Sequence, residues 1–563
     1  MTRRFIILGF LLTFLALGAV SCKSVADKVN DVTGSGKTVT VSIVYGSEKQ
    51  EWLEPLIQQY NGEKHKTSDG STIVVQGTPL GSVEAAEAIV AGTLQPTVWS
   101  PASSIYIPVA NAEWRKTKTT NLVEGTPKDI VLSPVVIAMW RPMAEALGWP
   151  QKPLGWADIA ALATSGQGWA AYGYPEWGDF KFGHTHPGYS NSGVSAIIAE
   201  AYAGAGKQRG LTVDDLNNPA LKDFMSKIQG AIIHYGSSTG FFADKMFGGG
   251  PSYLSAAVLY ENLVVAQESK RLAGKSPQPP VVAIYPKEGT FWANHPYIIL
   301  NAQWVTPEQR AAAEDFQKFL LDRPQQLSAL EYGFRPADPS VGLAAPLDQA
   351  HGVDPSQPNT VLEVPRAEVI QQTMNTWKQT KRPVDLTIVV DTSGSMRGDK
   401  INAVRNSLGQ FINLLDDRDR LRVVLFNSRA TEMSPLSPIA PKRSDLVRRV
   451  SGIVEGGETR LYDTVLDAYK GLTEKGDPKS IRAVVVLTDG QDNQSATKLP
   501  ALASAIQIPP EQGGNAIKVF TIAYGSDADR DVLTQIADAT GARMYEGKPE
   551  NIQQVYNDIA TFF

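Results

Sequence analysis

The stretch VDLTIVVDTSGS, residues 384–395, decides the fold of the C-terminal third of the chain. Residues 386–390 form an apolar run typical of a buried strand, and Asp391 follows directly. In a parallel sheet, ligands bind beyond the carboxyl ends of the strands, so Asp391, Ser393 and Ser395 stand where a site is expected. Oxygen-bearing side chains at alternate positions of a tight loop can converge on one point. Carboxylate and hydroxyl oxygens suit a hard octahedral cation such as Mg²⁺.

The same alternation of strand and helix continues to the C-terminus. Apolar strands are predicted at residues 386–390, 421–426, 483–487 and 518–524, with helical stretches between them. This order is typical of an α/β domain with a mainly parallel sheet.

Two further segments complete a motif. Residues 456–463 (GGETRLYD) form a Gly-rich loop that enters a helix, and residues 484–490 (VVVLTDG) form an apolar strand that ends in an acid and a turn. Over residues 384–563 the ordered set resembles the metal-ion-dependent adhesion site of von Willebrand factor A domains, which have a doubly wound, Rossmann-like fold. The resemblance implies that Mg²⁺, or another divalent cation such as Mn²⁺ or Ca²⁺, is bound there. The five positions of the site are then Asp391, Ser393, Ser395, Thr459 and Asp489.

The resemblance places the serine and threonine hydroxyls on or near the metal, with one or both aspartates acting through water. An acidic side chain of another protein can then complete the octahedron. Catalysis would need a general base or a nucleophile near the metal. No histidine follows His351, and we expect Asp463 and Asp492 to have solvated or structural roles. We therefore predict a site that binds a protein partner, in a chain that is not an enzyme.

The N-terminal part also alternates strands with helices. Residues 39–45 and 73–75 are predicted strands, and residues 50–60 and 83–91 carry apolar side chains at helical spacing. Residues 38–345 resemble the type II periplasmic solute-binding proteins, in which two α/β lobes close over a ligand. Segments that carry the resemblance are 45–47 (YGS), 97–100 (TVWS), the crossover strand 135–140, 186–193 (HPGYSNSG), 259–262 (LYEN) and 284–289 (IYPKEG).

Several of these segments are Ser/Gly clusters at predicted helix N-termini. Free amides and the helix dipole there can cradle an anion, and serine hydroxyls add donors. An oxyanion is one possible ligand, and a sugar stacked on Trp99, Tyr189 or Tyr260 is another. Two alternatives stay open: the residues only cap helices, or the cleft is vestigial and the domain is a scaffold. The residues that we predict to line the cleft are Ser47, Ser82, Ser103, Ser190 and Tyr260.

The N-terminus is typical of an exported protein. Arg3 and Arg4 precede an apolar run over residues 5–20, as in a secretory signal, although an uncleaved anchor remains an alternative. Residues 19–22 (AVSC) resemble the bacterial lipoprotein signal, in which the cysteine is acylated after cleavage; leucine is usual where Ala19 stands. Cys22 is the only cysteine, so an intramolecular disulfide is impossible. We expect an extracytoplasmic lipoprotein, anchored to the cell membrane through Cys22.

The predicted organisation is a signal peptide or anchor over 1–22, a tether over 23–37, the solute-binding-like domain over 38–345, a connector over 346–383 and the A domain over 384–563. The net charge of −5 and the lack of a Lys/Arg-rich run argue against a nucleic-acid partner. We predict a cell-envelope lipoprotein that binds a protein partner through its metal site, with the first domain binding a small ligand or acting as a scaffold. The alternative is the solute-binding component of an ABC-type importer for an oxyanion or a sugar, whose A domain recruits a protein.

Overall fold

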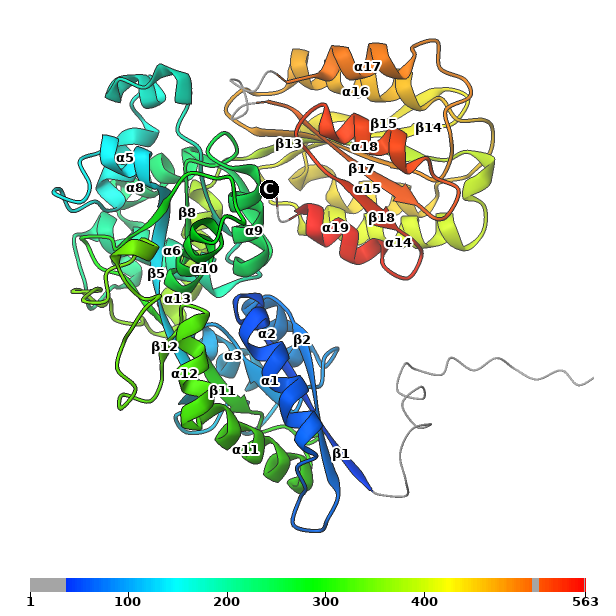
Figure 1. The fold of residues 1–563 in the computed structure, drawn as a ribbon. Helices are drawn as coiled ribbons and strands as arrows, with labels where there is room; N and C mark the ends of the chain where they lie inside the picture. The colour runs from blue at the N-terminus through cyan, green and yellow to red at the C-terminus, as the bar shows by residue number, and fades with distance from the viewer. Residues whose placement is uncertain (1–36, 509–515, 561, 563) are drawn as a thin grey trace, which may run out of the picture.

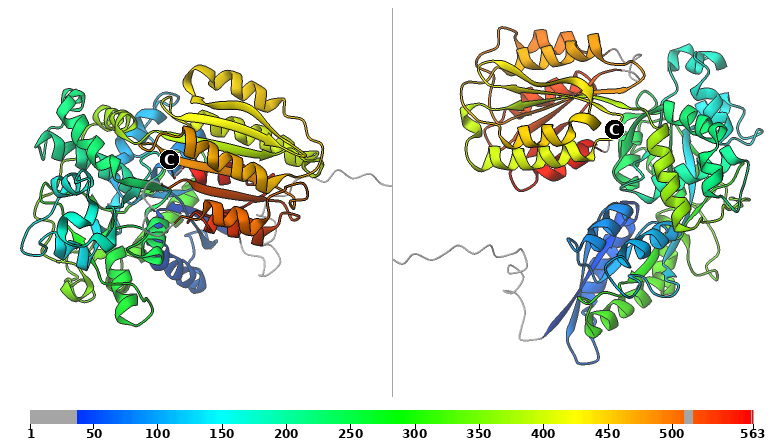
Figure 2. Two further views of the ribbon diagram at one scale, coloured as in Figure 1. Left: turned by 90° about the horizontal axis from the view of Figure 1, so that it is seen from above. Right: turned by 180° about the vertical axis from the view of Figure 1, so that it is seen from behind.

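A computed structural model describes residues 37–508, 516–560 and 562 of the chain. The predicted signal peptide, almost all of the predicted tether, and Cys22 lie outside these residues. Figures 1 and 2 show two α/β lobes and a third α/β unit that lies beside one of them. Across the described segments, no helix combines the length and the apolar character that a membrane crossing requires.

The first lobe contains a five-stranded sheet in the order β2-β1-β3-β11-β4. Strand β1 runs parallel to β2 and β3, whereas β11 is antiparallel to β3 and β4. Apolar side chains of the sheet and of α1 and α11 form a buried core. The elements are β1 (Thr38–Tyr45), α1 (Gln50–Glu63), β2 (Thr72–Pro79), α2 (Ser82–Ala91), β3 (Val98–Ser100), α3 (Ile107–Trp114), β4 (Lys128–Asp129), β11 (Pro296–Ile299), α11 (Pro307–Leu321) and α12 (Arg323–Glu331).

The second lobe is arranged around β5, which pairs with β8, β9, β10 and β12, all antiparallel. The sheet continues from β8 through β6 to β7 in parallel. Its elements are β5 (Val131–Trp140), α4 (Arg141–Ala146), α5 (Trp156–Ala163), β6 (Phe182–Thr185), α6 (Asn191–Ala205), α7 (Val213–Asn217), α8 (Pro219–Gly230), β7 (Ile232–Gly236), α9 (Thr239–Gly249), β8 (Ala256–Tyr260), α10 (Glu261–Leu272), β9 (Val281–Ile284), β10 (Trp292–Ala293) and β12 (Arg335–Pro336).

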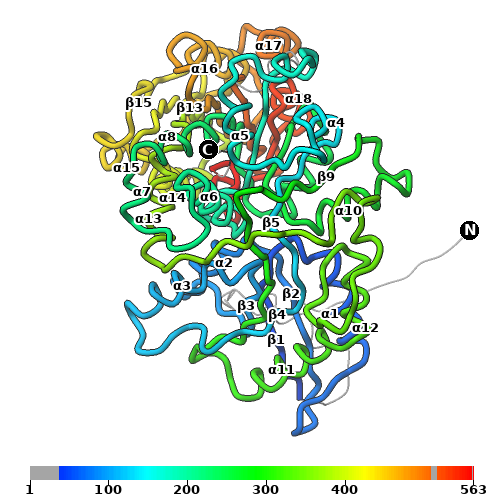
Figure 3. Tube along the Cα trace, turned by 90° about the vertical axis from the view of Figure 1, so that its left-hand side faces the viewer, coloured from blue at the N-terminus to red at the C-terminus, as the bar shows by residue number. Residues whose placement is uncertain are grey.

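The chain crosses between the lobes three times. It leaves the first lobe after β4 to enter β5, returns from β10 to β11, and enters the second lobe again from α12 to β12. Figure 3 shows the two lobes one above the other, joined by these segments. The predicted crossover strand at 135–140 is part of β5, and the two-lobed α/β architecture predicted from the sequence is confirmed.

The segment between the second lobe and the last domain packs against the second lobe. Helix α13 (Ala367–Thr380) contacts α6, α7 and α8. The Trp377 side chain is 1 % exposed, and its indole N–H donates to Gln229 Oε1 at 3.1 Å. The predicted connector, residues 346–383, therefore contributes to the core of the second lobe.

The C-terminal domain has a six-stranded sheet in the order β15-β14-β13-β16-β17-β18. All neighbouring pairs are parallel except β14 and β15, at one edge. One apolar core lies between the sheet and α14, α15 and α19, and a second between the opposite face and α16, α17 and α18. The elements are β13 (Val384–Asp391), α14 (Asp399–Leu414), β14 (Arg420–Phe426), β15 (Ala430–Pro438), α15 (Arg443–Ser451), α16 (Leu461–Lys475), β16 (Ile481–Thr488), α17 (Leu499–Ile506), β17 (Lys518–Tyr524), α18 (Arg530–Asp538), β18 (Met544–Gly547) and α19 (Ile552–Ala560).

The doubly wound, mainly parallel fold predicted for this domain is confirmed. Helices cover both faces of the sheet, as Figure 1 shows. Strands β13 and β16 are central and lie side by side in parallel, with Val390 opposite Leu487. Their carboxyl ends therefore meet at one edge of the sheet, and each is followed by a polar loop.

Candidate functional sites

Three segments of the C-terminal domain meet at the carboxyl edge of its sheet. Asp391 is the last residue of β13, and Asp489 directly follows β16. The amide of Ser393 donates to Asp391 Oδ1 at 2.7 Å. The hydroxyls of Ser393 and Ser395 lie 3.0 Å apart, and Ser395 donates to Asp489 Oδ1 at 2.7 Å. A continuous hydrogen-bonded path therefore joins four of the five positions that the resemblance implies.

Thr459 comes from a third segment, the Gly-rich loop before α16. This loop docks on the DxSxS turn: Gly394 N–H donates to Gly457 O at 3.0 Å, and Gly456 N–H donates to Thr392 O at 2.7 Å. A Cβ added at Gly490 would lie 3.3 Å from Thr459 Oγ1 and 3.9 Å from Ser395 Oγ. Both hydroxyls thus lie close to the turn that follows Asp489, so all five predicted side chains are gathered at this edge.

The carboxylates of this centre are buried, and a nearby positive charge would stabilise their ionised forms. Asp391 and Asp489 are both fully buried. Burial raises the pKa of Asp391 to about 6, the negative charge of Asp489 adds to this rise, and hydrogen bonds from Ser393 and Thr488 oppose it. Two carboxylates and three hydroxyls are hard oxygen donors, so the side chains present fit a small divalent cation.

One residue of the centre was missed by the sequence reasoning. Lys400, in the first turn of α14, places its Nζ 2.5 Å from Asp489 Oδ2. Its side chain is 25 % exposed, whereas that of Asp489 is 0 % exposed. No sequence signal marks this lysine, because its contact with Asp489 depends on how α14 packs against the sheet.

The other acids near the centre bind backbone amides. Asp492 Oδ1 accepts from Leu461 N–H at 2.8 Å, at the start of α16. Asp463 accepts from Ala496 N–H and Thr497 N–H at 2.9 and 3.0 Å. These contacts are consistent with the structural roles expected for both acids. Within the described ranges, no group of three or more His, Cys, Asp or Glu is placed to hold a metal, and the centre at Asp391 depends on hydroxyls instead.

The residues predicted to line the solute cleft are buried where the lobes meet. The Ser47 hydroxyl contacts the Ser238 hydroxyl of the other lobe and accepts from Gly240 N–H at 3.1 Å. Ser82 and Ser103 accept from Ala102 N–H and Ile105 N–H, at 3.0 and 3.2 Å. The Ser190 hydroxyl lies 3.1 Å from Thr239 Oγ1, and Tyr260 is 0 % exposed. The serines therefore bond to the protein itself.

The N-terminus of α2 shows how closely the lobes approach. The amides of Val83 and Glu84 both donate to the carbonyl oxygen of Tyr189, in the second lobe, at 3.0 and 3.1 Å. A Cβ at Gly81 would collide with that same oxygen. The helix N-terminus that could cradle an anion thus binds a carbonyl of the partner lobe.

A charged cluster at the same junction was not predicted. Lys49 Nζ lies 2.8 Å from Glu48 Oε1 and 3.2 Å from His295 Nδ1, and all three residues are buried. Burial alone would raise the pKa of Glu48, but Lys49 and His295 outweigh it and lower the pKa to about 2. A cavity of about 590 Å³ opens beside Ser47 and Glu48, between α1, α9 and α10. Of the five predicted cleft residues, Ser47 alone lines it.

The fold and the two sites define a two-lobed binding protein followed by a von Willebrand factor type A domain. The family model for bacterial extracellular solute-binding proteins matches residues 41–335, more than half of the chain. The chain belongs to that family. The model for the von Willebrand factor type A domain matches residues 385–558. The resemblances inferred from the sequence are confirmed, and the family places this protein outside the cytoplasm.

The relatives named here each match one part of the chain. Human inter-alpha-trypsin inhibitor heavy chain H4 is 25% identical over 193 residues, which cover 32% of this chain and 20% of that protein. The probable E3 ubiquitin-protein ligase WAVH2 of Arabidopsis thaliana is 29% identical over 136 residues, which cover 23% of this chain and 18% of that protein. A periplasmic thiamin binding protein of known structure is 11% identical, with a TM-score of 0.44 over 62% of this chain and 98% of that one. The chain therefore spans about a fifth of these curated relatives' length.

Proposed function

We propose that this chain is an envelope-anchored binding protein whose A domain holds a protein partner through a divalent cation, with no catalytic step. One observation carries the proposal. Oxygen-bearing side chains from three separate segments converge at the open edge of the sheet, around Asp391, Ser395 and Thr459. Ser395 and Gly394 are exposed, so the outer side of the centre is accessible to a partner's carboxylate.

The hydroxyls and the carboxylates have different roles in the proposed metal binding. A divalent cation, when bound, supplies an electron-poor centre that an acidic side chain can complete. The hydroxyls of Ser393, Ser395 and Thr459 are neutral donors and leave the positive charge largely uncompensated. Asp391 and Asp489 are buried and hydrogen-bonded to Ser393 and Ser395 on the inner side of the centre, and Lys400 pairs with Asp489.

Mg²⁺-dependent capture tests this function. The full chain should retain a protein from envelope extracts in Mg²⁺ and release it with a chelator. Asp391→Ala should abolish the retention, whereas Asp467→Ala, which removes an exposed acid of α16, should leave it intact. Equal retention by both variants, or retention that survives the chelator, would contradict a metal-mediated contact.

For the first domain we propose a small solute as the ligand, on the basis of the family membership. The contact between Tyr189 and the α2 amides means that a solute can reach those amides only when the lobes separate. An importer component should gain thermal stability from an oxyanion or a sugar. A domain with no such response across a panel of both classes would be a scaffold for the A domain.

We also propose that Cys22 carries the lipid anchor. The absence of a second cysteine in the sequence leaves it no intramolecular disulfide partner. Cys22→Ser should release the chain from membranes into the soluble fraction. Continued membrane retention of Cys22→Ser would instead favour an uncleaved N-terminal anchor.

A further inference from the structure

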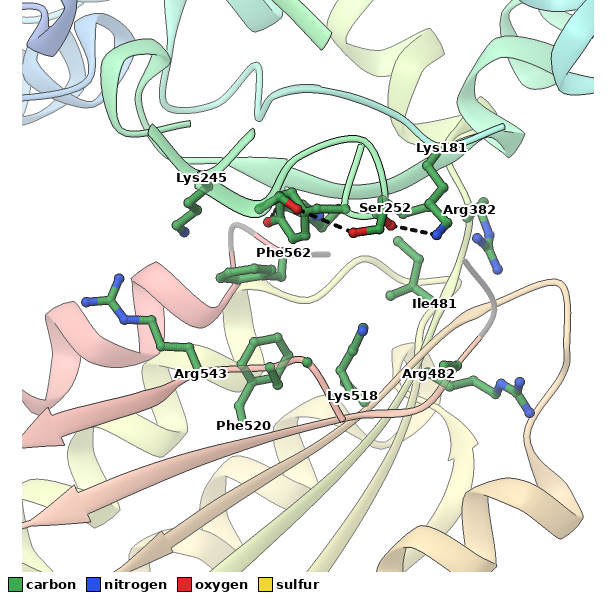
Figure 4. A pocket seen from close by; sticks show the side chains of 18 of the residues that line it. Lys181, Lys245, Ser252, Arg382, Ile481, Arg482, Lys518, Phe520, Arg543 and Phe562 are labelled. Atoms are coloured by element: carbon green, nitrogen blue, oxygen red, sulfur yellow. Dashed lines mark hydrogen bonds between the residues drawn. The ribbon is translucent and has the colours of Figure 1, made fainter. Parts of the chain in front are cut away.

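A pocket of about 300 Å³ lies between the second lobe and the A domain, away from both sites described above. The second lobe supplies one wall, with Lys181 just before β6, residues of β7 and α9, and the loop that follows α9, and the edge of the A-domain sheet supplies the other. Figure 4 shows Lys518 and Phe520 rising from that sheet toward the lobe, with Lys181 and Lys245 across the gap. The pocket exists only because the two domains lie together.

The pocket is strongly cationic. Its lining contains Lys181, Lys245, Arg382, Arg482, Lys518 and Arg543, and no Asp or Glu among the described residues. Lys181 Nζ donates to Ser252 O at 2.7 Å, and Lys518 Nζ donates to Thr540 O at 2.8 Å. Within the described part of the chain, neither of these lysines, nor Lys245 or Arg543, has a carboxylate within 4.0 Å. Among the described residues, the hydrogen-bond acceptors of Lys181 and Lys518 are neutral backbone carbonyls.

The concentration of positive charge is costly to the protein. Burial, together with the charge of Lys181, lowers the pKa of Lys518 to about 8. Burial and the charge of Arg543 likewise lower the pKa of Lys245 to about 8, although Asp558 opposes the shift. The buried lysine of the lobe junction, Lys49, contrasts with both, because it has Glu48 as a direct partner. An anion in the pocket would relieve the repulsion.

The remaining walls are flat and apolar. The Phe562 ring lies 4.8 Å from the Phe520 ring and 5.3 Å from the His234 ring, and Lys245 Nζ lies 4.6 Å from its centroid. Burial holds the pKa of His234 well below its usual range, so this ring is neutral. The apolar lining also includes Ile233, Tyr253, Ile481, Ala483 and Ala542. Apolar walls with convergent charged groups are typical of small-molecule sites.

We infer that this pocket binds a small organic anion, a molecule with a flat apolar body and one carboxylate, phosphate or sulfonate group. The apolar body fits among Phe520, Phe562 and Tyr253, and the acid faces Lys181, Lys245 and Lys518. Because each domain supplies part of the charge, the bound anion holds the A domain against the second lobe. The site therefore couples the position of the partner-binding domain to a small ligand.

The probe for the test is 8-anilinonaphthalene-1-sulfonate, an aromatic sulfonate whose fluorescence rises on binding. We expect the full chain to bind it saturably, with one tight site. Lys245→Gln combined with Lys518→Gln should weaken that site about tenfold or more, because charge-assisted contacts are strong. Lys227→Gln combined with Lys475→Gln removes two exposed lysines, one from each domain, and should leave the affinity unchanged.

A third variant separates shape from charge. Ala542→Trp keeps every cation but fills the apolar part of the pocket, so it should also lose the tight site. Folding of each variant is checked by circular dichroism and by its melting temperature. The proposal is overturned if the full chain has no saturable site, if the pocket and control double variants bind equally, or if Ala542→Trp binds as well as the unmodified chain.

Discussion

Lys400 Nζ lies 2.5 Å from Asp489 Oδ2, so a lysine of α14 neutralises one of the two buried carboxylates of the proposed metal centre. Asp489 also accepts a hydrogen bond from Ser395. Because Lys400 occupies the other carboxylate oxygen, it competes with any cation that Asp489 would bind. The Lys400 carbonyl accepts from the Tyr524 hydroxyl at 3.1 Å, which fixes the backbone of this turn. The lysine therefore acts as an internal counter-ion that a metal has to displace or share.

Replacing that lysine should strengthen metal binding. In Lys400→Met the methionine keeps the length and apolar stem of the side chain but leaves Asp489 without its ion pair. Because a hydrogen bond to a charged group contributes about 1.5–3 kcal/mol, Mg²⁺ affinity should rise about tenfold or more. Isothermal titration measures it, with Lys470→Met on α16 as the exposed control. An unchanged Mg²⁺ affinity in Lys400→Met would mean that displacing the lysine from Asp489 costs no free energy.

Asp391→Asn should remove the metal response without unfolding the domain. Asparagine can still accept from Ser393 N–H, and its amide can donate to Thr488 Oγ1, so the turn is preserved. Mg²⁺ at a hundred times its Kd stabilises a folded protein by about 2.7 kcal/mol, which raises the melting temperature by about 5 °C or more. The A-domain transition of the variant should show no such rise. A full rise in the variant would show that Asp391 does not serve the metal.

The sequence predicted the A domain well because its signals are local. Strand β17 begins and ends at the predicted residues 518 and 524, and the DxSxS turn follows its strand as expected. Thr459 could be placed only through the family resemblance, since its loop reaches the turn by contacts such as Gly394 with Gly457. Lys400 carried no signal, because a lysine in the first turn of a helix is usually a solvated residue.

The contacts between the lobes were harder to predict, because they join residues that are far apart in the sequence. Ser47, Ser82, Ser103 and Ser190 do stand near helix starts, but a pattern along the chain does not say which lobe fills their acceptors. Tyr189, whose carbonyl oxygen accepts from the α2 amides, lies more than a hundred positions after them in the sequence. The buried contact of Lys49 with His295 is likewise a product of how the lobes close.

Gly81→Ala should weaken the closed arrangement of the lobes. Gly81 has φ −60° and ψ 137°, which alanine adopts freely, so the cost comes from contacts of its Cβ with the second lobe, chiefly the collision with the Tyr189 carbonyl and a close approach of 3.0 Å to Ser237 O. We expect a larger radius of gyration in small-angle X-ray scattering and a lower melting temperature of the first domain. Gly62→Ala in α1 is the control, because a Cβ there meets nothing within 4 Å. Identical scattering curves for the two variants would contradict the role given to this contact.

Glu200 should make the second lobe less stable as the pH rises. It is fully buried in α6, and burial raises its pKa to about 8, although a hydrogen bond from Gln229 opposes the shift. The folded chain thus holds a proton that the unfolded chain loses above its ordinary pKa. The contribution of Glu200 to stability is full below about pH 4.5 and is lost progressively up to about pH 8.

Glu200→Gln removes this loss, because the amide stays neutral at every pH. The variant should be more stable than the parent by about 3 kcal/mol at pH 7 and by less than about 1 kcal/mol at pH 5. Urea unfolding at the two pH values measures the difference. A gain that is the same at both would mean that Glu200 is ionised in the folded protein.

The anion pocket should lose its ligand at alkaline pH. Lys245 faces Arg543 and Asp558, and Lys518 faces Lys181; Arg382, Arg482, the neutral His234 and Tyr253 complete the charged or titratable lining. Burial raises the pKa of Tyr253 above its usual range, and the arginines stay charged, so the two lysines with pKa values of about 8 are the first to change.

Each of these two lysines loses its positive charge as the pH rises, and the sulfonate probe does not titrate in this range. The affinity for the probe should therefore be highest below pH 7 and fall between pH 7 and pH 9.5, whereas the Lys245→Gln, Lys518→Gln double variant should show a much flatter profile. A parent profile as flat as that of the double variant would mean that these lysines do not hold the anion.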